Sequence, residues 1–250
     1  MALLFRFALL FGWAAIASPA TAEGYCRERE YKGDEYTICT VDPKKSTIRI
    51  HDLDPTARPY KTFTALADKL RSDGIFMRIA MNGGMYRPDF SPVGLYVENG
   101  IEKQKLNTNP GWGNFHLLPN GVFYLLPGEA GVMEAKAFAA SAIKPLFATQ
   151  SGPMLVIDDN IHPKFDPQSD SLKKRNGIGV TADGKVVFAV SEGNVRFHDL
   201  ATLFRDDLGC RNALFLDGTI SALYVPEWHR SDDAYPLGPI ISVEISIPPD

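Results

Sequence analysis

Apolar stretches separated by short turn dipeptides recur along this chain, and they limit it to a strand-rich fold. Asn99-Gly100, Asn120-Gly121 and Asp183-Gly184 each stand between two such stretches. Asn-Gly and Asp-Gly favour the tight turns of β-hairpins, because both central residues of those turns adopt positive φ. The 21 glycines and 18 prolines supply many further turns. The pattern therefore predicts a protein built mainly from hairpins.

The same pattern gives the expected elements by residue range. Hairpins are expected at 36–41 with 47–51, 93–98 with 101–106, 115–118 with 122–126, and 178–181 with 185–190. Single strands are expected at 75–81, 154–157, 213–216, 220–225 and 240–247. One helix begins at a cap, Thr62 or Thr64, and ends at Gly74, and a second covers 199–208. Because the helices do not alternate with strands, we expect a single α+β domain, mostly antiparallel.

The first residues have the pattern of a secretory signal peptide. Residues 2–17 are almost entirely apolar, Arg6 lies near the start, and the segment ends in Ala20-Thr21-Ala22. A membrane anchor is the alternative, but the apolar run is shorter than the roughly 20 residues that a transmembrane helix needs. We expect cleavage after Ala22, a mature domain of residues 23–250 without stable membrane insertion, and a periplasmic or secreted location.

The net charge and the cysteines limit which partners and which cellular compartment the protein can have. The formal net charge of −4 argues against a nucleic-acid partner, because phosphate neutralisation needs a basic surface. An oxidising compartment favours one disulfide among Cys26, Cys39 and Cys210. The sequence alone leaves all three pairings open, with Cys26–Cys39 preferred because it closes a short loop, and Cys210 is then a buried thiol.

Known catalytic and metal signatures are missing from the sequence. The five histidines show neither His-x-His nor His-Glu-x-x-His spacing, so we expect no zinc site, and no cofactor is expected. Asp158-Asp159-Asn160 is interpreted as a hairpin turn and not as a cation site. No Gly-x-Ser-x-Gly motif marks a serine nucleophile.

Functional groups coincide with turn residues at several strand ends. Two glycines after Asn82 allow positive φ and direct backbone N–H groups toward one point, which suits an anion. Arg175 at the entry of a glycine-bearing strand can bind a phosphate bidentately. Asp217 follows an apolar strand, where a carboxylate is held rigidly. Each pattern taken alone is also typical of an ordinary turn or of a surface arginine.

Taken together and in order, these stretches resemble the phosphodiester glycosidase domain family over residues 36–247. The resemblance rests on Asn82-Gly83-Gly84-Met85-Tyr86, Ser151-Gly152-Pro153-Met154-Leu155-Val156, Arg175-Asn176-Gly177-Ile178-Gly179, Ser191-Glu192-Gly193 and Leu216-Asp217-Gly218-Thr219-Ile220-Ser221. It implies hydrolysis of a sugar-1-phosphodiester at the glycosidic bond, which releases a sugar and leaves a phosphomonoester. Two departures are visible. Thr219-Ile220 replaces two glycines of the animal members, and Glu192 stands where the family usually has Asp.

The chemistry assigns roles to these residues. Glycoside cleavage usually needs two carboxylates, but a phosphate leaving group is already a stable anion, so donors that hold it matter more than its protonation. Asp217 is the expected catalytic carboxylate, acting on the sugar or its water, with Glu192 second. Arg175 and the amides of Gly83 and Gly84 are expected to hold the phosphate.

The remaining candidates contact the substrate, which is a small molecule or an envelope glycan carrying a phosphodiester. These candidates are Asn82, Ser151, Gly152 and Ser221. The competing hypothesis is a non-catalytic module that binds an envelope glycan or glycophosphate. Trp112, Phe115 and Trp228 can stack on sugar rings under either hypothesis, or can pack in the core.

Overall fold

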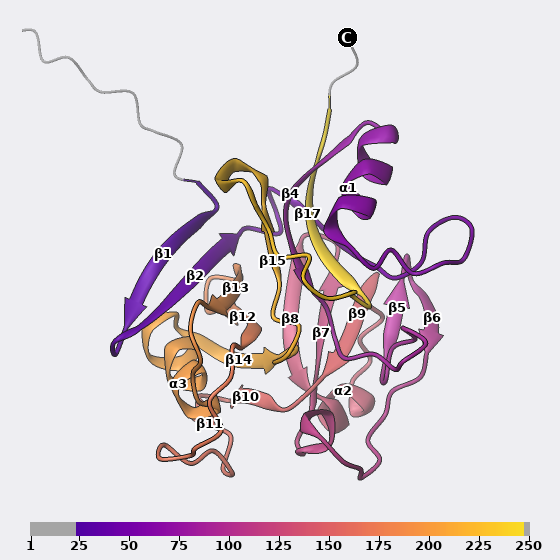
Figure 1. The fold of residues 1–250 in the computed structure, drawn as a ribbon. Helices are drawn as coiled ribbons and strands as arrows, with labels where there is room; N and C mark the ends of the chain where they lie inside the picture. The colour runs from indigo at the N-terminus through magenta and orange to yellow at the C-terminus, as the bar shows by residue number, and fades with distance from the viewer. Residues whose placement is uncertain (1–23, 248–250) are drawn as a thin grey trace, which may run out of the picture.

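The computed structural model describes residues 24–247 and arranges them as three β-sheets with short helices outside them (Figure 1). The first sheet has the order β1 (Cys26–Tyr31), β2 (Asp34–Val41), β13 (Val186–Ser191), β12 (Asn176–Thr181), β14 (Cys210–Phe215), β10 (Met154–Ile157) and β11 (Asn160–Ile161). The second has the order β16 (Arg230–Ser231), β15 (Leu223–Val225), β4 (Ile75–Asn82), β17 (Ile240–Ser246) and β3 (Thr47–His51). The third has the order β6 (Ile101–Gln104), β5 (Tyr96–Glu98), β9 (Phe147–Ser151), β7 (Gly121–Leu126) and β8 (Glu129–Glu134).

Every pair of neighbouring strands within these three sheets is antiparallel. The expected antiparallel, strand-rich architecture is therefore confirmed. The α+β label fits only loosely, because the helices are few and short. They are α1 (Phe63–Ser72), α2 (Ala135–Ala140) and α3 (Phe197–Thr202), the last continued by a π-helical turn over Leu203–Asp207, with 3₁₀ turns at Asn114–His116 and Pro226–Trp228.

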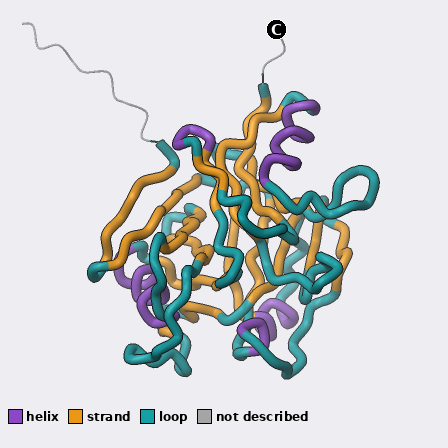
Figure 2. The backbone as a smooth tube through the Cα atoms, in the orientation of Figure 1, coloured by secondary structure: helices purple, strands orange, loops and turns teal. Residues whose placement is uncertain are grey.

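The helices cover the outer faces of the sheets, as Figure 2 shows. Thr62 caps α1: its Oγ1 accepts a hydrogen bond of 3.1 Å from the N–H of Ala65, so of the two expected caps, Thr62 and Thr64, the structure uses Thr62. Its apolar side packs on the second sheet around Met77 and Ile240. α3 and the following turn pack on the first sheet in the same way. None of the helices among residues 24–247 is long and apolar enough to span a membrane.

The central core is shared by all three sheets. Ile50 from the second sheet, Phe123 from the third and Phe188 from the first belong to one cluster of buried apolar side chains, and each is at most 1% exposed. A core built jointly by three sheets fixes how the sheets lie against one another, because close-packed side chains tolerate little displacement.

The turn dipeptides predicted some hairpins correctly and others wrongly. Asn99 and Gly100 both have positive φ and connect β5 with β6, and Gly184 turns the chain between β12 and β13. The hairpin expected around Asn120-Gly121 is wrong, because Asn120 is buried and donates side-chain hydrogen bonds to the carbonyls of Asn107 and Phe115. The strand that begins at Gly121 pairs instead with β8, beyond Pro127 and Gly128.

A second expected hairpin is also wrong. β2 and β3 form close to the expected ranges, but they belong to different sheets. β2 pairs instead with β1, an edge strand that the sequence pattern did not reveal, and β3 pairs with β17. Local turn residues cannot tell whether a chain reverses within one sheet or crosses to another, since both need the same sharp bend.

The predicted Cys26–Cys39 disulfide is confirmed. The two cysteines face each other in the β1–β2 register, and the bond ties the edge strand to β2. Cys210 is free and buried, and burial raises the pKa of its thiol to about 12. A disulfide is consistent with an oxidising compartment. The predicted signal peptide, residues 1–22, lies outside the described residues.

We expect the double substitution Cys26→Ala with Cys39→Ala to lower the free energy of unfolding by about 2–4 kcal/mol. Most side chains of β1 are exposed, so this strand buries little apolar surface that would hold it in place. Urea unfolding with and without dithiothreitol measures the effect. The stability of the double variant should be the same with and without dithiothreitol. If dithiothreitol also leaves the stability of the wild type unchanged, the expectation is contradicted.

Candidate active site

Antiparallel pairing brings several of the motifs to one place. β12 runs antiparallel to both β13 and β14, so the start of β12 lies beside the ends of the other two strands. Asn176 is paired with Val190, and Gly177 with Phe215. Three motifs far apart in the sequence therefore meet at one edge of the first sheet, where Asp217 follows β14.

Side chains from the other two sheets complete this meeting point, which we call the three-sheet junction. Asn82 ends β4 in the second sheet, and its Oδ1 accepts hydrogen bonds from Asn176 Nδ2 at 2.6 Å and from the N–H of Ala222 at 2.9 Å. Ser151 ends β9 in the third sheet, and its Oγ donates to the carbonyl oxygen of Leu216 at 2.8 Å. All three side chains, Asn82, Asn176 and Ser151, are at most 2% exposed.

Asp217 is positioned by this network. Asn176 Oδ1 accepts a hydrogen bond of 2.9 Å from the N–H of Asp217, which links the backbone of the residue to Asn82 through the Asn176 amide. Ser221 is buried, and its Oγ donates to the Asp217 carbonyl oxygen at 2.7 Å, so this serine closes the turn that we call the Asp217 turn, residues 216–221. The network leaves the carboxylate itself free of side-chain donors among the described residues.

The electrostatics of Asp217 are unusual for a surface-turn aspartate. Burial raises the pKa of its carboxyl above the ordinary value of 3.8, and the facing N–H groups of Ile220, Gly218 and Thr219 oppose that shift. The Ile220 N–H lies 3.3 Å from Oδ1. Tyr86 lies near enough for the charge of Asp217 to add to the effect of burial, which raises the tyrosine pKa to about 12. A raised pKa brings a carboxyl closer to the range in which it exchanges protons near neutral pH.

The paired glycines after Asn82 serve a different purpose from the predicted one. Neither has positive φ, and both amides are already bonded: Gly83 N–H donates to Pro239 O at 2.6 Å and Gly84 N–H to Thr149 Oγ1 at 3.1 Å. The predicted phosphate cradle from these amides is therefore corrected. A Cβ on Gly84 would lie 2.2 Å from the carbonyl oxygen of Gln150, so glycine is needed there for the close approach of β4 and β9.

Arg175 lies on the far side of β12 from the second sheet's residues. Its guanidinium carbon is 3.6 Å from the ring centre of Phe197, and Nε and Nη2 donate to the carbonyl oxygens of Val195 and Ser171, each at 2.9 Å. The residue is 1% exposed, and no carboxylate among residues 24–247 lies within salt-bridge distance of it. Burial lowers the pKa of the guanidinium to about 10. Arg175 is thus a buried cation without an acidic partner.

Glu192, the second predicted carboxylate, is not free in this structure. Its Oε1 accepts from Thr37 Oγ1 and from Arg230 Nη1, both at 2.6 Å. Arg230 in turn binds Asp232 through Nη2 at 2.8 Å. Glu192 therefore belongs to an ion-pair chain beside the junction, while Asp217 stands apart from it.

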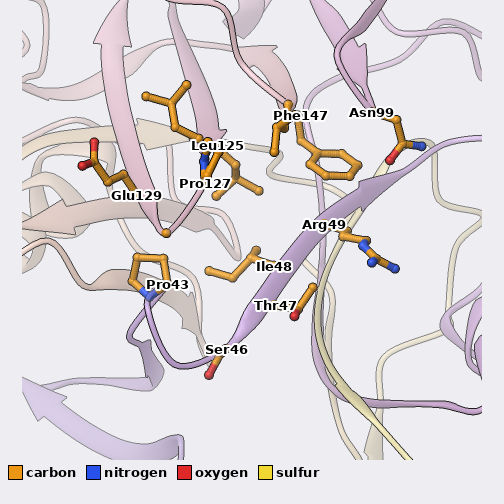
Figure 3. Close-up of a pocket in the computed structure, with 13 residues that line it drawn as sticks. Pro43, Ser46, Thr47, Ile48, Arg49, Asn99, Leu125, Pro127, Glu129 and Phe147 are labelled. Carbon is orange, nitrogen blue, oxygen red and sulfur yellow. The ribbon is translucent and has the colours of Figure 1, made fainter.

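Two cavities clarify where a ligand can reach the protein. The larger, about 410 Å³, lies between the start of β3 and the β7–β8 turn, and none of the predicted site residues lines it (Figure 3). Phe147 at the start of β9 borders it, whereas Ser151 at the other end of that strand is about 13 Å away. A second cavity of about 370 Å³ is lined by Thr219, Ile220 and Ser221, so it borders the Asp217 turn.

The site also contains residues to which the sequence motifs assigned no role. Asn176 joins Asn82 to Asp217, whereas the sequence motif that contains it assigns a role only to Arg175. Gln150 accepts from the N–H groups of Leu95 and Asn107 through Oε1, at 2.9 Å each. Thr149 Oγ1 holds Gly84. Their signal in the sequence was a polar side chain in an otherwise apolar strand. Within residues 24–247 no three His, Cys, Asp or Glu side chains group as metal ligands.

Comparison with known proteins identifies the family of this chain. The family model for phosphodiester glycosidases matches residues 77–243, which include the predicted catalytic and substrate-contacting residues. The chain belongs to the phosphodiester glycosidase family. It is also 37% identical over 209 residues to the uncharacterized protein YigE of Escherichia coli, covering 82% of this chain and 80% of that protein.

Solved structures with the same fold match this chain at low sequence identity. One is the catalytic domain of zebrafish N-acetylglucosamine-1-phosphodiester α-N-acetylglucosaminidase, auto-inhibited by its pro-peptide, with a TM-score of 0.60 and 13% identity over 92% of this chain and 85% of that one. Another is a hypothetical protein from Synechocystis, with a TM-score of 0.58 and 15% identity over 88% of this chain. The present chain spans 61% of that Synechocystis protein.

We expect Gly84→Ala to lower the free energy of unfolding by about 2 kcal/mol or more, because the added Cβ overlaps backbone and not a movable side chain. Gly193→Ala is the matched control, since a Cβ there meets nothing within 4 Å. Its stability should stay the same or rise by up to about 1 kcal/mol. Urea unfolding of both variants decides the matter, and similar small effects would refute the close-approach explanation.

We expect Asp217→Asn to change how stability depends on pH. The folded state holds the Asp217 proton more tightly than the unfolded state, so the wild type loses stability as pH rises from about 3.8 through the raised folded pKa. The neutral asparagine shows no such loss, so the variant should gain on the wild type between pH 4 and pH 7.5.

Asp89→Asn provides the opposite control. Hydrogen bonds from the hydroxyl and N–H of Ser91 lower the pKa of Asp89, so this wild-type carboxylate favours folding more as pH rises. Urea unfolding at pH 4 and pH 7.5 gives the free energy of unfolding of each variant relative to wild type. This difference should rise with pH for Asp217→Asn and fall with pH for Asp89→Asn. A pH-independent difference for Asp217→Asn would contradict the raised pKa.

Proposed function

We propose that this protein hydrolyses the glycosidic bond of a sugar-1-phosphodiester, with Asp217 as the catalytic carboxylate. The observation that carries the proposal is the placement of Asp217 at the three-sheet junction, fixed through Asn176 and without an ion-pair partner among residues 24–247. Membership of the phosphodiester glycosidase family supports the same reaction type. Rigid placement of a carboxylate with a raised pKa is what a general base or a nucleophile at carbon requires.

The reaction balances with water as the only other reactant. The bond between the anomeric carbon and the phosphate oxygen breaks, and both bonding electrons leave with the phosphate. The oxygen of water bonds to the anomeric carbon, and one of its protons passes to the Asp217 carboxylate. The products are a free sugar and a phosphomonoester. Since the leaving group is already a stabilised anion, the scheme needs no second carboxylic acid to protonate it.

The phosphate end of the substrate is assigned to Arg175. A buried guanidinium without a carboxylate partner leaves a positive charge uncompensated in a medium of low dielectric, and an anionic ligand would relieve that cost. Its stacking on Phe197 and its two bonds to carbonyl oxygens hold the planar group in place. Asn82 and Ser151 act indirectly, because their hydrogen bonds to Asn176 and Leu216 hold the three sheets together at the junction.

The proposal extends to the sugar and to the cellular location. The zebrafish relative is named for N-acetylglucosamine, which makes that sugar a candidate here. Thr219 and Ile220, in the Asp217 turn, are larger than the glycines of the animal members, so a different sugar is equally open to test. The disulfide and the predicted signal peptide favour a periplasmic or secreted protein that acts on an envelope glycan or on a smaller phosphodiester.

We expect the purified mature protein to release free sugar from a panel of glucose, mannose and N-acetylglucosamine 1-(methyl phosphate) diesters. Asp217→Asn should lower kcat by at least about a thousandfold, because the group that receives the proton is lost. Glu192→Gln should retain far more activity, since Glu192 is engaged by Arg230 and Thr37. Circular dichroism confirms that each variant is folded, and sugar release is measured enzymatically.

Two outcomes would overturn this assignment. An Asp217→Asn enzyme with wild-type kcat would remove the proposed catalytic residue. Saturable binding of every diester without any release of sugar would instead favour the non-catalytic glycophosphate-binding module.

A further inference from the structure

A polar cavity adjoins the Asp217 turn, and Arg175 is not among its lining residues; we call it the side hollow. Its volume is about 370 Å³, and its lining residues are Lys174, Thr219, Ile220, Ser221, Ala222, Ser231, Asp232, Asp233, Ala234 and Tyr235. One wall is therefore the Asp217 turn, and the other is the segment that follows β16. This volume is in the range of small-molecule sites.

The wall that follows β16 is held rigidly along its length. Asp232 accepts from the N–H of Leu223 at 3.1 Å, and Asp233 accepts from the N–H of Phe63 at 3.0 Å, where α1 begins. Beyond them, Leu237 N–H donates to the carbonyl oxygen of Lys61 at 2.8 Å. Tyr235, between these fixed points, is nevertheless 55% exposed. An aromatic ring held open on a rigid wall is suited to stacking against a sugar ring.

The charges in the side hollow favour a neutral polyol over a phosphate. Asp232 and Asp233 contribute two carboxylates, and Lys174, with its Nζ 3.8 Å from Asp232 Oδ2, contributes a cation. Arg230 also binds Asp232, through Nη2 at 2.8 Å, so the charges at the hollow are balanced and offer a phosphate no unpaired cation. Each carboxylate oxygen has more than one lone pair, so these groups can still accept hydrogen bonds from sugar hydroxyls.

The adjacent residues Lys174 and Arg175 separate these two environments. Successive side chains of an extended segment point to opposite sides. Lys174 borders the side hollow, while Arg175 packs against Phe197 and, at 5.7 Å, against the ring of Phe215. A Cβ on Gly218 would lie 3.5 Å from that same Phe215 ring, so the Asp217 turn and Arg175 both lie next to this ring.

We propose that the side hollow is the sugar subsite, with Tyr235 as its stacking platform, and that substrate lies across the Asp217 turn with its phosphate toward Arg175. This inference rests on the proposed function for the direction of the substrate. Occupation of the hollow by a sugar is a separate property that binding alone can measure.

The test uses the full mature protein and three probes, methyl α-glucoside, methyl α-mannoside and methyl N-acetyl-α-glucosaminide. We expect at least one of them to bind by saturation-transfer NMR. Tyr235→Ala should weaken that binding about threefold to tenfold, whereas Tyr235→Phe, which keeps the ring, should stay close to wild type. Ile101→Ala is the matched control, because Ile101 is 63% exposed but does not line the hollow.

Inorganic phosphate provides the second arm of the test. It should not displace the bound methyl glycoside, since the proposed phosphate position lies on the other side of the turn. The proposal is overturned if none of the glycosides binds, if Tyr235→Ala binds as well as wild type, if Ile101→Ala weakens binding as much as Tyr235→Ala, or if phosphate competes. Sugar binding that depends on Tyr235 in a protein without hydrolase activity would instead uphold the subsite and refute only the proposed reaction.

Discussion

The hydrogen bond between the side-chain amides of Asn82 and Asn176 is the contact on which the rest of the site depends. It joins the second sheet to the first at a point where both residues are almost completely buried. A buried amide without partners is costly, so each of its polar atoms restricts where neighbouring backbone can lie. Asn82 Oδ1 also accepts a hydrogen bond from the N–H of Ala222, and Asn176 Oδ1 accepts one from the N–H of Asp217, so both sides of the turn that carries the proposed catalytic carboxylate are held.

Two opposite charges stand on either side of that turn without forming an ion pair. Burial raises the pKa of the Asp217 carboxyl and lowers the pKa of the Arg175 guanidinium. A protein under selection for stability alone would pair such groups or replace them, because isolated buried charges are expensive. The presence of both groups in one protein fits a substrate that supplies the missing partners, and perturbed ionisable groups are typical of functional sites.

The fold was predictable where local chemistry decided the structure. Positive φ at Gly100 follows from its lack of a Cβ and at Asn99 from its short polar side chain, and the Thr62 cap follows from its hydroxyl. Prediction failed where the same local signal serves two structures. Asn120-Gly121 has the residues of a tight turn, yet the Asn120 side chain is held by the carbonyl groups of Asn107 and Phe115 in the preceding loop. The bend between β2 and β3 could not reveal that it connects two sheets, because that depends on partners far along the chain.

For the site, the sequence by itself determined which residues are available: the order of the motifs, the carboxylate of Asp217 after an apolar strand, and the family. The tertiary structure alone decided their roles. It directed Asn82 into the interior, used the Gly83 and Gly84 amides for internal bonds, and placed Lys174 and Arg175 in different environments. The physical reason is that residue type sets what a group can donate, accept or carry, whereas burial and partners, which come from distant segments, set which of those capacities is left for a substrate.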